Sequence, residues 1–165
     1  MKVGILIISD RASRGEYEDK SAPIIQEKLK IYSNWHITHE AIVPDEFEQI
    51  VETLTNWSDE GVNLLLTSGG TGFSPRDITP EATKRVIERE APGLAEAVRA
   101  ESLKITQHAM LSRAVAGIRK QTLIINMPGN PKAVQENLEF LLPVLPHALD
   151  LLIEAQDSDQ QHRSV

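Results

Sequence analysis

The feature that most constrains the fold is a strand, a glycine-rich turn and a helix start that follow one another over residues 62–82. Residues 62–67 form a short, largely apolar run, which is the pattern of a parallel strand buried on both faces. The turn Gly69-Gly70-Thr71-Gly72 follows this strand. Thr79 and Pro80 then have the residue types of a helix N-cap and a first helical residue. A strand that leads through a tight turn into a helix is typical of an α/β fold.

The rest of the chain repeats this alternation of strand and helix. A continuous apolar run at residues 3–8 predicts a buried strand, and residues 37–43 predict another. Apolar residues at helical spacing predict helices over residues 22–31 and 47–57. Later segments predict helices 81–90 and 94–104, tightly joined antiparallel strands 114–118 and 122–126, and helices 132–142 and 146–154. We therefore expect a three-layer, doubly wound α/β domain with a mostly parallel sheet, helices on both faces and a short antiparallel strand pair.

The composition fits one ordinary globular domain. The chain has 165 residues, 41% of them hydrophobic, and it contains no cysteine. We expect a single domain over residues 1–155 and a polar, disordered tail over residues 156–165. The absence of cysteine excludes disulfides, thiolate catalysis and zinc–thiolate sites, and it indicates a cytoplasmic protein. No apolar run is long enough to cross a bilayer, so no membrane partner is expected.

The glycine-rich turn is suited to binding an anion. Glycines let backbone N–H groups approach a phosphate closely, and the positive end of the following helix favours bound phosphate further. The turn is neither a Walker loop, because Phe73 follows Gly72, nor a dinucleotide-binding G-x-G-x-x-G motif. Since the net charge of −7 argues against a general nucleic-acid binder, the anion is expected to be met by this local site. The alternative is a tight strand-to-helix connection that binds no ligand.

Four loops are expected to meet at one edge of the sheet. In an open α/β sheet, ligands bind beyond the carboxyl ends of the strands, at the point where the strand order reverses. The four loops that qualify by position cover residues 9–20, 43–46, 68–79 and 126–131. They carry polar side chains such as Asp10, Asp45 and Asp77, so the sequence predicts one site built from all four.

Taken in order, these segments resemble the MogA/MoaB family of molybdenum cofactor biosynthesis proteins, which includes the G domain of gephyrin. The resemblance covers nearly the whole chain and rests on Ser9-Asp10-Arg11-Ala12-Ser13 with Gly15, Tyr17 and Asp19, on Val43-Pro44-Asp45-Glu46, on the loop 67–82, on Pro92-Gly93, on Leu111-Ser112-Arg113 with Ala116-Gly117, and on Asn126-Met127-Pro128-Gly129-Asn130-Pro131. The chain departs from the family at Ala22, where many relatives have glycine. It also ends soon after Glu154, where longer members carry an extra segment.

The resemblance implies a homotrimeric molybdopterin adenylyltransferase that uses Mg-ATP. Aspartates matching Asp45 and Asp77 are needed for activity in the enzymatic members, so we expect these two residues to be catalytic and to hold Mg²⁺. The residues expected to bind the substrates and their phosphates are Ser9, Asp10, Arg11, Ser68, Gly69, Gly70, Thr71, Gly72, Arg76, Ser112, Arg113, Pro128, Gly129, Asn130 and Pro131. A molybdate-insertion protein is a further expected partner.

Other interpretations stay open at this stage. Asp45 and Asp77 also suit the capping of a helix or turn, Arg113 suits a structural ion pair, and residues 128–131 suit a plain turn. The family includes scaffold proteins, which bind molybdopterin or a partner protein without transferring a nucleotide. CinA-type nucleotide pyrophosphatases share the fold and a similar loop, but they typically read Gly-Gly-Leu-Gly-Pro-Thr, which Thr71 and Phe73 do not match.

Overall fold

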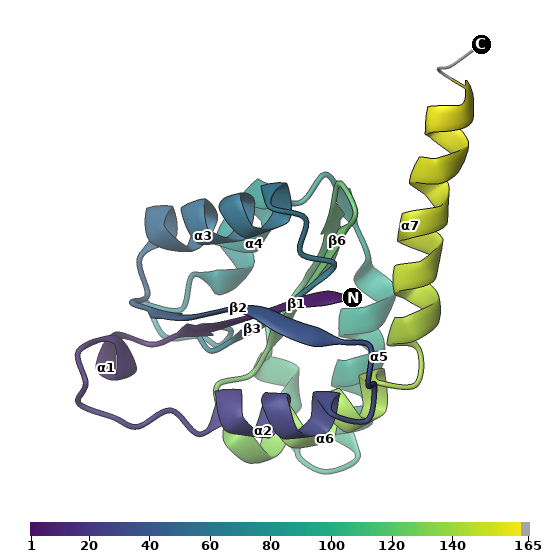
Figure 1. Ribbon diagram of the computed structural model, residues 1–165. Helices are drawn as coiled ribbons and strands as arrows, with labels where there is room; N and C mark the ends of the chain where they lie inside the picture. The colour runs from purple at the N-terminus through teal and green to yellow at the C-terminus, as the bar shows by residue number, and fades with distance from the viewer. Residues whose placement is uncertain (163–165) are drawn as a thin grey trace.

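The computed structural model describes residues 1–162, and it describes side chains through residue 154. The protein folds around a sheet with the strand order β2-β1-β3-β6-β5-β4 (Figure 1). The strands are β1 (Lys2–Ile8), β2 (His36–Val43), β3 (Leu64–Ser68), β4 (Arg89–Glu90), β5 (Ala116–Arg119) and β6 (Thr122–Met127). β2, β1, β3 and β6 are parallel, whereas β5 is antiparallel to β6 and to β4. The predicted doubly wound, mostly parallel fold is confirmed, and the predicted antiparallel pair corresponds to β5 and β6.

Helices cover both faces of the sheet and enclose two apolar cores. α2 (Ser21–Leu29), α5 (Pro92–Leu103), α6 (Pro131–Leu141) and the start of α7 (Leu145–His162) pack on one face, whereas α3 (Phe47–Asp59) and α4 (Thr79–Val86) pack on the other (Figure 1). Successive side chains of β1 alternate between these cores: Val3 and Ile5 belong to the first, and Leu6 to the second. Burial on both faces explains why the central strands are continuous apolar runs in the sequence.

The strand order reverses between β1 and β3. From β1 the chain passes through α2 to β2, and then through α3 back across β1 to β3. The chain therefore leaves β1 toward α2 on one face of the sheet and leaves β3 toward α4 on the opposite face. A crevice opens between these two segments. This reversal fixes where a ligand site is expected in the fold.

The sequence is wrong about one stretch after the glycine-rich loop. It predicts a helix over residues 81–90, but α4 ends at Val86, and Arg89–Glu90 forms the edge strand β4. A Cβ added to Gly117 would lie 2.8 Å from the carbonyl oxygen of Arg89, so β4 approaches β5 closely because Gly117 has no side chain. Pairing with β5 thus overrides the local helical pattern.

Three further segments differ from the predictions. The short helix α1 (Asp10–Ser13) and the 3₁₀ helix η1 (Gln107–Leu111) lie in stretches that the sequence leaves as loops. α7 continues to His162, past the predicted helix end at Glu154. The boundary of the predicted tail at residue 156 stays a prediction, and residues 163–165 of that tail lie outside the described residues.

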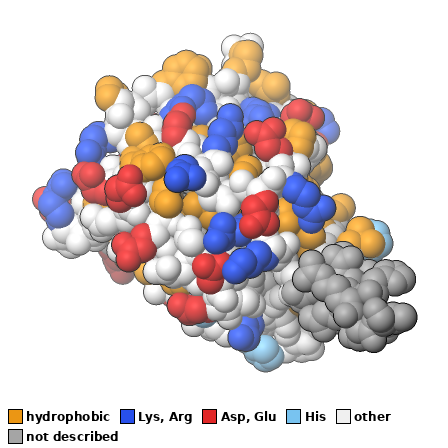
Figure 2. Space-filling view, turned by 90° about the horizontal axis from the view of Figure 1, so that it is seen from above, with side chains coloured by type: hydrophobic (Ala, Val, Ile, Leu, Met, Phe, Trp, Pro, Cys, Tyr) orange, Lys and Arg blue, Asp and Glu red, His pale blue; other side chains and the backbone are white. Residues whose placement is uncertain are grey.

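None of the helices within residues 1–162 combines the length and the apolar character that a bilayer crossing requires. On the face shown in Figure 2, acidic and basic side chains are interspersed with apolar ones.

Candidate functional site

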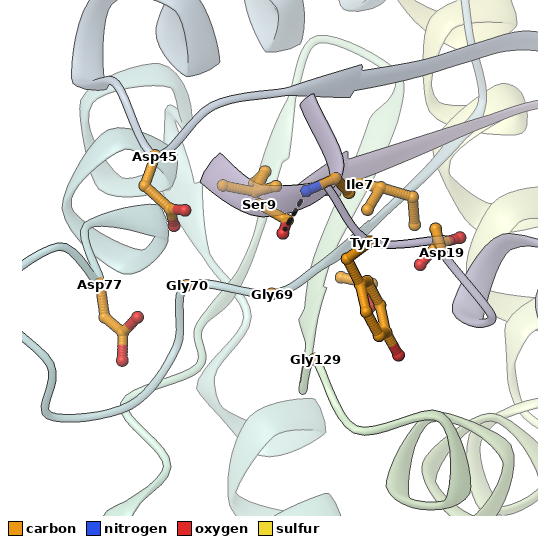
Figure 3. Close-up of a pocket in the computed structure, with 12 residues that line it drawn as sticks. Ile7, Ser9, Tyr17, Asp19, Asp45, Gly69, Gly70, Asp77 and Gly129 are labelled. Atoms are coloured by element: carbon orange, nitrogen blue, oxygen red, sulfur yellow. Dashed lines mark hydrogen bonds between the residues drawn. The ribbon is translucent and has the colours of Figure 1, made fainter. Parts of the chain in front are cut away.

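A cavity of about 240 Å³ lies at the reversal point, between the carboxyl ends of β1 and β3. Figure 3 shows Asp45, Asp77 and Gly70 on one side of this cavity and Tyr17 and Asp19 on the other. Its lining comes from all four predicted loops and the end of β1: Ile7, Ile8, Ser9, Ala12, Tyr17, Asp19, Asp45, Ser68, Gly69, Gly70, Asp77 and Gly129. The predicted convergence of the four loops is therefore present in the structure.

The glycine-rich loop takes a backbone path that requires glycine. Gly69 has φ +106° and Gly70 has φ +64°, both in the left-handed region. A Cβ on Gly69 would lie 2.1 Å from the carbonyl oxygen of Ile8, so the loop presses directly against the end of β1. Only glycine allows this approach, which brings the backbone of the loop to the edge of the cavity.

Thr79 fastens this loop to the start of α4. Its hydroxyl donates to the carbonyl oxygen of Gly69 at 2.9 Å, and its backbone N–H donates to that of Gly70 at 3.1 Å. The prediction that Thr79 is the helix N-cap is wrong, because Ile78 occupies the N-cap and Thr79 is the first helical residue. The hydroxyl instead donates to the carbonyl oxygen of Gly69, and so it holds the glycine-rich loop in place.

Asp77 closes the outer part of the loop. Its Oδ2 accepts hydrogen bonds from the backbone N–H groups of Gly72 at 3.0 Å and Ser74 at 3.1 Å. This agrees with the interpretation that Asp77 caps its own turn, and the carboxylate still lines the cavity. A Cβ on Gly72 would lie 2.9 Å from Oδ2, so Gly72 leaves the room that this carboxylate needs.

Asp45 is held by Asp10, which follows β1. The N–H of Asp10 donates to Asp45 Oδ2 at 2.9 Å, and the N–H of Asp45 donates to Asp10 Oδ1 at 3.0 Å. Asp45 is not the N-cap of α3, because Glu46 holds that position. Burial raises the pKa of the Asp45 carboxyl, the Asp10 N–H opposes that shift, and the negative charges of Asp10 and Asp77 add to it. The charges of Asp10 and Asp77 therefore disfavour the ionised Asp45 carboxylate beyond the effect of burial, and the nearby charge of Arg76 partly offsets them.

Arg76 and Arg113, two of the three arginines expected to bind the substrates, are engaged by protein groups. Arg76 forms ion pairs with Asp10 and Glu46, and its hydrogen bond to Asp10 holds the pKa of the Asp10 carboxyl below its usual range. Arg113 donates to the carbonyl oxygens of Gly72 and Asp77 and pairs with Glu81. These contacts agree with the interpretation that Arg113 is a structural ion-pair partner, and they brace the glycine-rich loop.

The remaining predicted residues mostly shape the loops. The Ser68 hydroxyl donates to the carbonyl oxygen of Pro128 at 2.8 Å, which ties the end of β3 to the turn after β6. The Ser9 hydroxyl accepts a hydrogen bond from the N–H of Ala12 at 3.2 Å as the N-cap of α1. The Arg11 guanidinium carbon lies 5.4 Å from the centre of the Tyr17 ring. Asn130 caps α6, which begins at Pro131. A Cβ on Gly129 would lie 3.4 Å from Gly69 Cα, so the two turns are in contact.

A second cavity, of about 610 Å³, adjoins the other end of the glycine-rich loop. Its lining runs from that loop over α5, η1 and the start of α6: Thr71, Gly72, Val98, Arg99, Ser102, Ile105, Thr106, His108, Ala109, Leu111, Ser112, Pro128, Asn130, Lys132, Ala133, Glu136 and Asn137. Ser112 thus lies here rather than in the first cavity. The loop separates two hollows, and its residues contribute to both.

Sequence reasoning missed several lining residues. Tyr17 and Asp19 stand in the first family motif, and that motif was the signal that could have placed them in the site. Arg99, His108 and Lys132 carry no local signal, because they meet only when α5, η1 and the start of α6 are packed. Within residues 1–154, no three histidine or acidic side chains gather closely enough to hold a metal ion by themselves.

Comparisons with known proteins place the chain among its relatives. The family described as "Probable molybdopterin binding domain" matches residues 4–147. Molybdopterin adenylyltransferase from Helicobacter pylori (strain J99) is 48% identical over 153 residues, which cover 92% of this chain and 87% of that protein. Gephyrin from Dictyostelium discoideum is 46% identical over 173 residues, but the match covers only 24% of gephyrin, so the chain spans about a quarter of that relative. The molybdopterin biosynthesis enzyme MoaB from Thermus thermophilus superposes with a TM-score of 0.87 at 50% identity, covering 92% of this chain and 95% of that one.

Proposed function

The chain belongs to the molybdopterin-binding family that its resemblance to MogA and MoaB predicts, and we propose that it is a molybdopterin adenylyltransferase of molybdenum cofactor biosynthesis. In this reaction a phosphate oxygen of molybdopterin attacks the α-phosphorus of ATP. The bond from that phosphorus to the oxygen bridging to the β-phosphate breaks, and pyrophosphate leaves. The product is adenylylated molybdopterin.

The observation that carries the proposal is the placement of the glycine-rich loop between two aspartates at the reversal point of the sheet. Gly69 and Gly70 line the first cavity together with Asp45 and Asp77. The N–H groups of Gly69 and Gly72 donate to Met127 O and Asp77 Oδ2, so phosphate oxygens would be bound by other backbone N–H groups of the loop, which can stabilise the charge that develops during transfer. Phosphoryl chemistry depends mainly on positioning and electrostatic stabilisation, which a loop held by Thr79 and Asp77 can provide.

Two cavities that meet at one phosphate loop also suit a reaction with two substrates. Thr71 and Gly72 border the larger cavity, whereas Gly69 and Gly70 border the smaller one. Two ligands that occupy the two cavities would bring their phosphates together at the loop. The remaining residues of the four loops, among them Ser9, Arg11 and Asn130, would shape the walls around these phosphates.

Asp45 and Asp77 fit a magnesium ion that arrives with ATP. Both carboxylates line the first cavity, and the charges of Asp10 and Asp77 contribute to the raised pKa of Asp45, so a cation there would offset repulsion. Mg²⁺ in such sites usually takes one or two carboxylates and completes its shell with water and phosphate oxygens. When bound, it would screen the repulsion between the two phosphate groups.

We extend the proposal to the assembly and the compartment. Leu103, Ile105, Met110 and Leu111 are exposed apolar side chains close together in the sequence at the end of α5 and in η1, which favours the expected homotrimer. The lack of cysteine favours the cytoplasm, where the product would be handed to a molybdate-insertion protein. Sedimentation of the purified protein tests the trimer directly.

The experiment that tests the activity supplies molybdopterin, Mg²⁺ and α-labelled ATP to the purified protein. We expect label to enter adenylylated molybdopterin, with pyrophosphate released only when both molybdopterin and Mg²⁺ are present. Tight molybdopterin binding without transfer would instead assign the protein to the scaffold class. Pyrophosphate cleavage from a nucleotide without molybdopterin would favour a CinA-type activity.

A further inference from the structure

Arg76 connects three of the four loops around the site. Its Nε donates to Asp10 Oδ2 at 3.0 Å and its Nη2 donates to Asp10 Oδ1 at 2.9 Å, so the guanidinium grips this carboxylate with two parallel hydrogen bonds. Nη2 also donates to Glu46 Oε1 at 2.8 Å. Arg76 follows β3, Asp10 follows β1 and Glu46 follows β2. One side chain therefore joins the segments beyond three neighbouring strands.

The connection continues from Asp10 to Asp45. Asp10 Oδ1, which Arg76 holds, also accepts the N–H of Asp45 at 3.0 Å. Asp45 Oδ2 in turn accepts the N–H of Asp10 at 2.9 Å. The other oxygen, Asp45 Oδ1, lies 3.0 Å from the position that a Cβ on Gly70 would take. A continuous chain of hydrogen bonds thus runs from Arg76 through Asp10 to Asp45 at the glycine-rich loop.

Arg76 also precedes Asp77 in the chain. Asp77 Oδ2 holds the N–H groups of Gly72 and Ser74, so the loop arm that carries Arg76 also carries the second aspartate of the site. Given the proposed adenylyl transfer, we propose that Arg76 is a positioning residue that sets the spacing between Asp45 and Asp77, and that it acts through Asp10 and Glu46 rather than as a phosphate contact.

The expected effect lies in geometry rather than in stability. Arg76 is half exposed, and exposed ion pairs contribute only about 0 to 1 kcal/mol to folding. A displacement of a reacting group by about 1 Å, in contrast, can cost about 100-fold in rate. A direct phosphate contact would require Arg76 to leave two carboxylates that it already binds. These magnitudes favour a clamp whose loss slows the reaction while the fold persists.

The variants that test this role are Arg76→Gln, Arg76→Lys and Glu46→Gln. Arg14→Gln is the matched control, because Arg14 is similarly exposed and also grips one carboxylate with two hydrogen bonds, but its partner Glu16 belongs to the same loop. It removes the same charge near the site without separating loops. Lysine cannot form the fork that Arg76 makes with Asp10, so Arg76→Lys should recover only part of the loss.

The first readout is backbone amide hydrogen exchange in the ligand-free protein. Arg76→Gln should speed exchange in residues 43–46 and 70–77 while the melting temperature stays near that of the wild type, and Arg14→Gln should leave both segments unchanged. This measurement does not depend on catalysis. If the wild type proves to have no transferase activity, the proposed function fails, but exchange still decides whether Arg76 is a clamp.

The second readout separates kcat from KM. Arg76→Gln should lower kcat by about 10- to 100-fold and change the KM for ATP by less than about threefold. Glu46→Gln should shift kcat in the same direction by less. A raised KM with unchanged kcat and unchanged exchange would overturn the proposal and make Arg76 a phosphate contact. An equal loss in Arg14→Gln would also overturn it, because charge alone would then explain the effect.

Discussion

Asp10 and Asp45 each donate a backbone N–H to the carboxylate of the other, at 2.9 and 3.0 Å. These reciprocal bonds join the segments that follow β1 and β2, which are neighbours in the sheet. They also leave Asp45 Oδ1 beside Gly70, at the edge of the glycine-rich loop. The sheet topology and one pair of hydrogen bonds together place a half-buried carboxylate at the edge of the first cavity.

Asp45→Asn should abolish transfer and stabilise the ligand-free protein. The amide keeps an oxygen that can accept the Asp10 N–H, but it removes the charge, so transfer should fall by about 100-fold or more. Because burial raises the pKa of Asp45 in the folded protein, the stability linked to its protonation is present below about pH 3.8 and is lost as pH rises through the folded-state pKa. At pH 7 the wild type therefore carries a cost that the variant lacks.

Thermal unfolding of both proteins between pH 7 and pH 3.5 checks this sign. The variant should melt above the wild type at pH 7, and the difference should shrink as the pH approaches 3.8. Glu48→Gln is the control. Glu48 lies in the first turn of α3, where a negative charge is favourable, so the loss of this charge should not raise the melting temperature at pH 7. A lower melting temperature for Asp45→Asn at pH 7 would show that its hydrogen bonds outweigh its burial.

Asp77 should have two separable roles. Asp77→Asn keeps an acceptor for the N–H groups of Gly72 and Ser74, whereas Asp77→Ala removes it. Both variants should lose transfer, because both remove the charge proposed to hold Mg²⁺. Only Asp77→Ala should also lose about 1 to 3 kcal/mol of stability, measured by denaturant unfolding, since two loop donors lose their partner. Full transfer by Asp77→Asn would exclude a role for its charge.

Gly70→Ala should damage the site more than its backbone strain explains. Gly70 has φ +64°, and a Cβ there would lie 2.3 Å from Thr79 Oγ1 and 3.0 Å from Asp45 Oδ1. Gly61→Ala is the control, because Gly61 has φ +82° but open space around its Cβ position. Each alanine should cost about 1 to 2 kcal/mol of folding stability for its left-handed backbone. Only Gly70→Ala should lose more than about tenfold in transfer rate. If both variants transferred at the same rate, the close contacts of Gly70 with Thr79 and Asp45 would not matter for the reaction.

The sequence predicts most of the scaffold but not the use of individual side chains. The strands and the four loops follow from apolar runs and polar turn residues, because burial on both faces leaves a strong local pattern. Thr79 has the residue type of an N-cap, yet its hydroxyl holds Gly69 across the loop. Arg89 and Glu90 continue a helical pattern, yet they pair with β5. In each case a partner distant in sequence determines the outcome, and local propensity contains no information about that partner.

Arg113 should affect both stability and transfer, because it braces the glycine-rich loop from outside. Its side chain donates to the carbonyl oxygens of Gly72 and Asp77, and its backbone N–H donates to the carbonyl oxygen of Thr71 at 2.9 Å. Arg113→Met keeps much of the apolar stem but leaves the two carbonyl groups without this donor. We expect a loss of about 1 to 3 kcal/mol in urea unfolding and a lower kcat.

Glu81→Gln separates this bracing from the ion pair that Arg113 also forms. It removes the charge of the partner in α4 and leaves the contacts to both carbonyls, and an exposed pair of this kind contributes about 0 to 1 kcal/mol. Glu81→Gln should therefore remain close to the wild type in unfolding and in transfer. If it matched Arg113→Met, the ion pair would be the main interaction. If Arg113→Met raised the KM for ATP without a loss of stability, Arg113 would contact the phosphates directly, because bracing cannot be removed without weakening the loop.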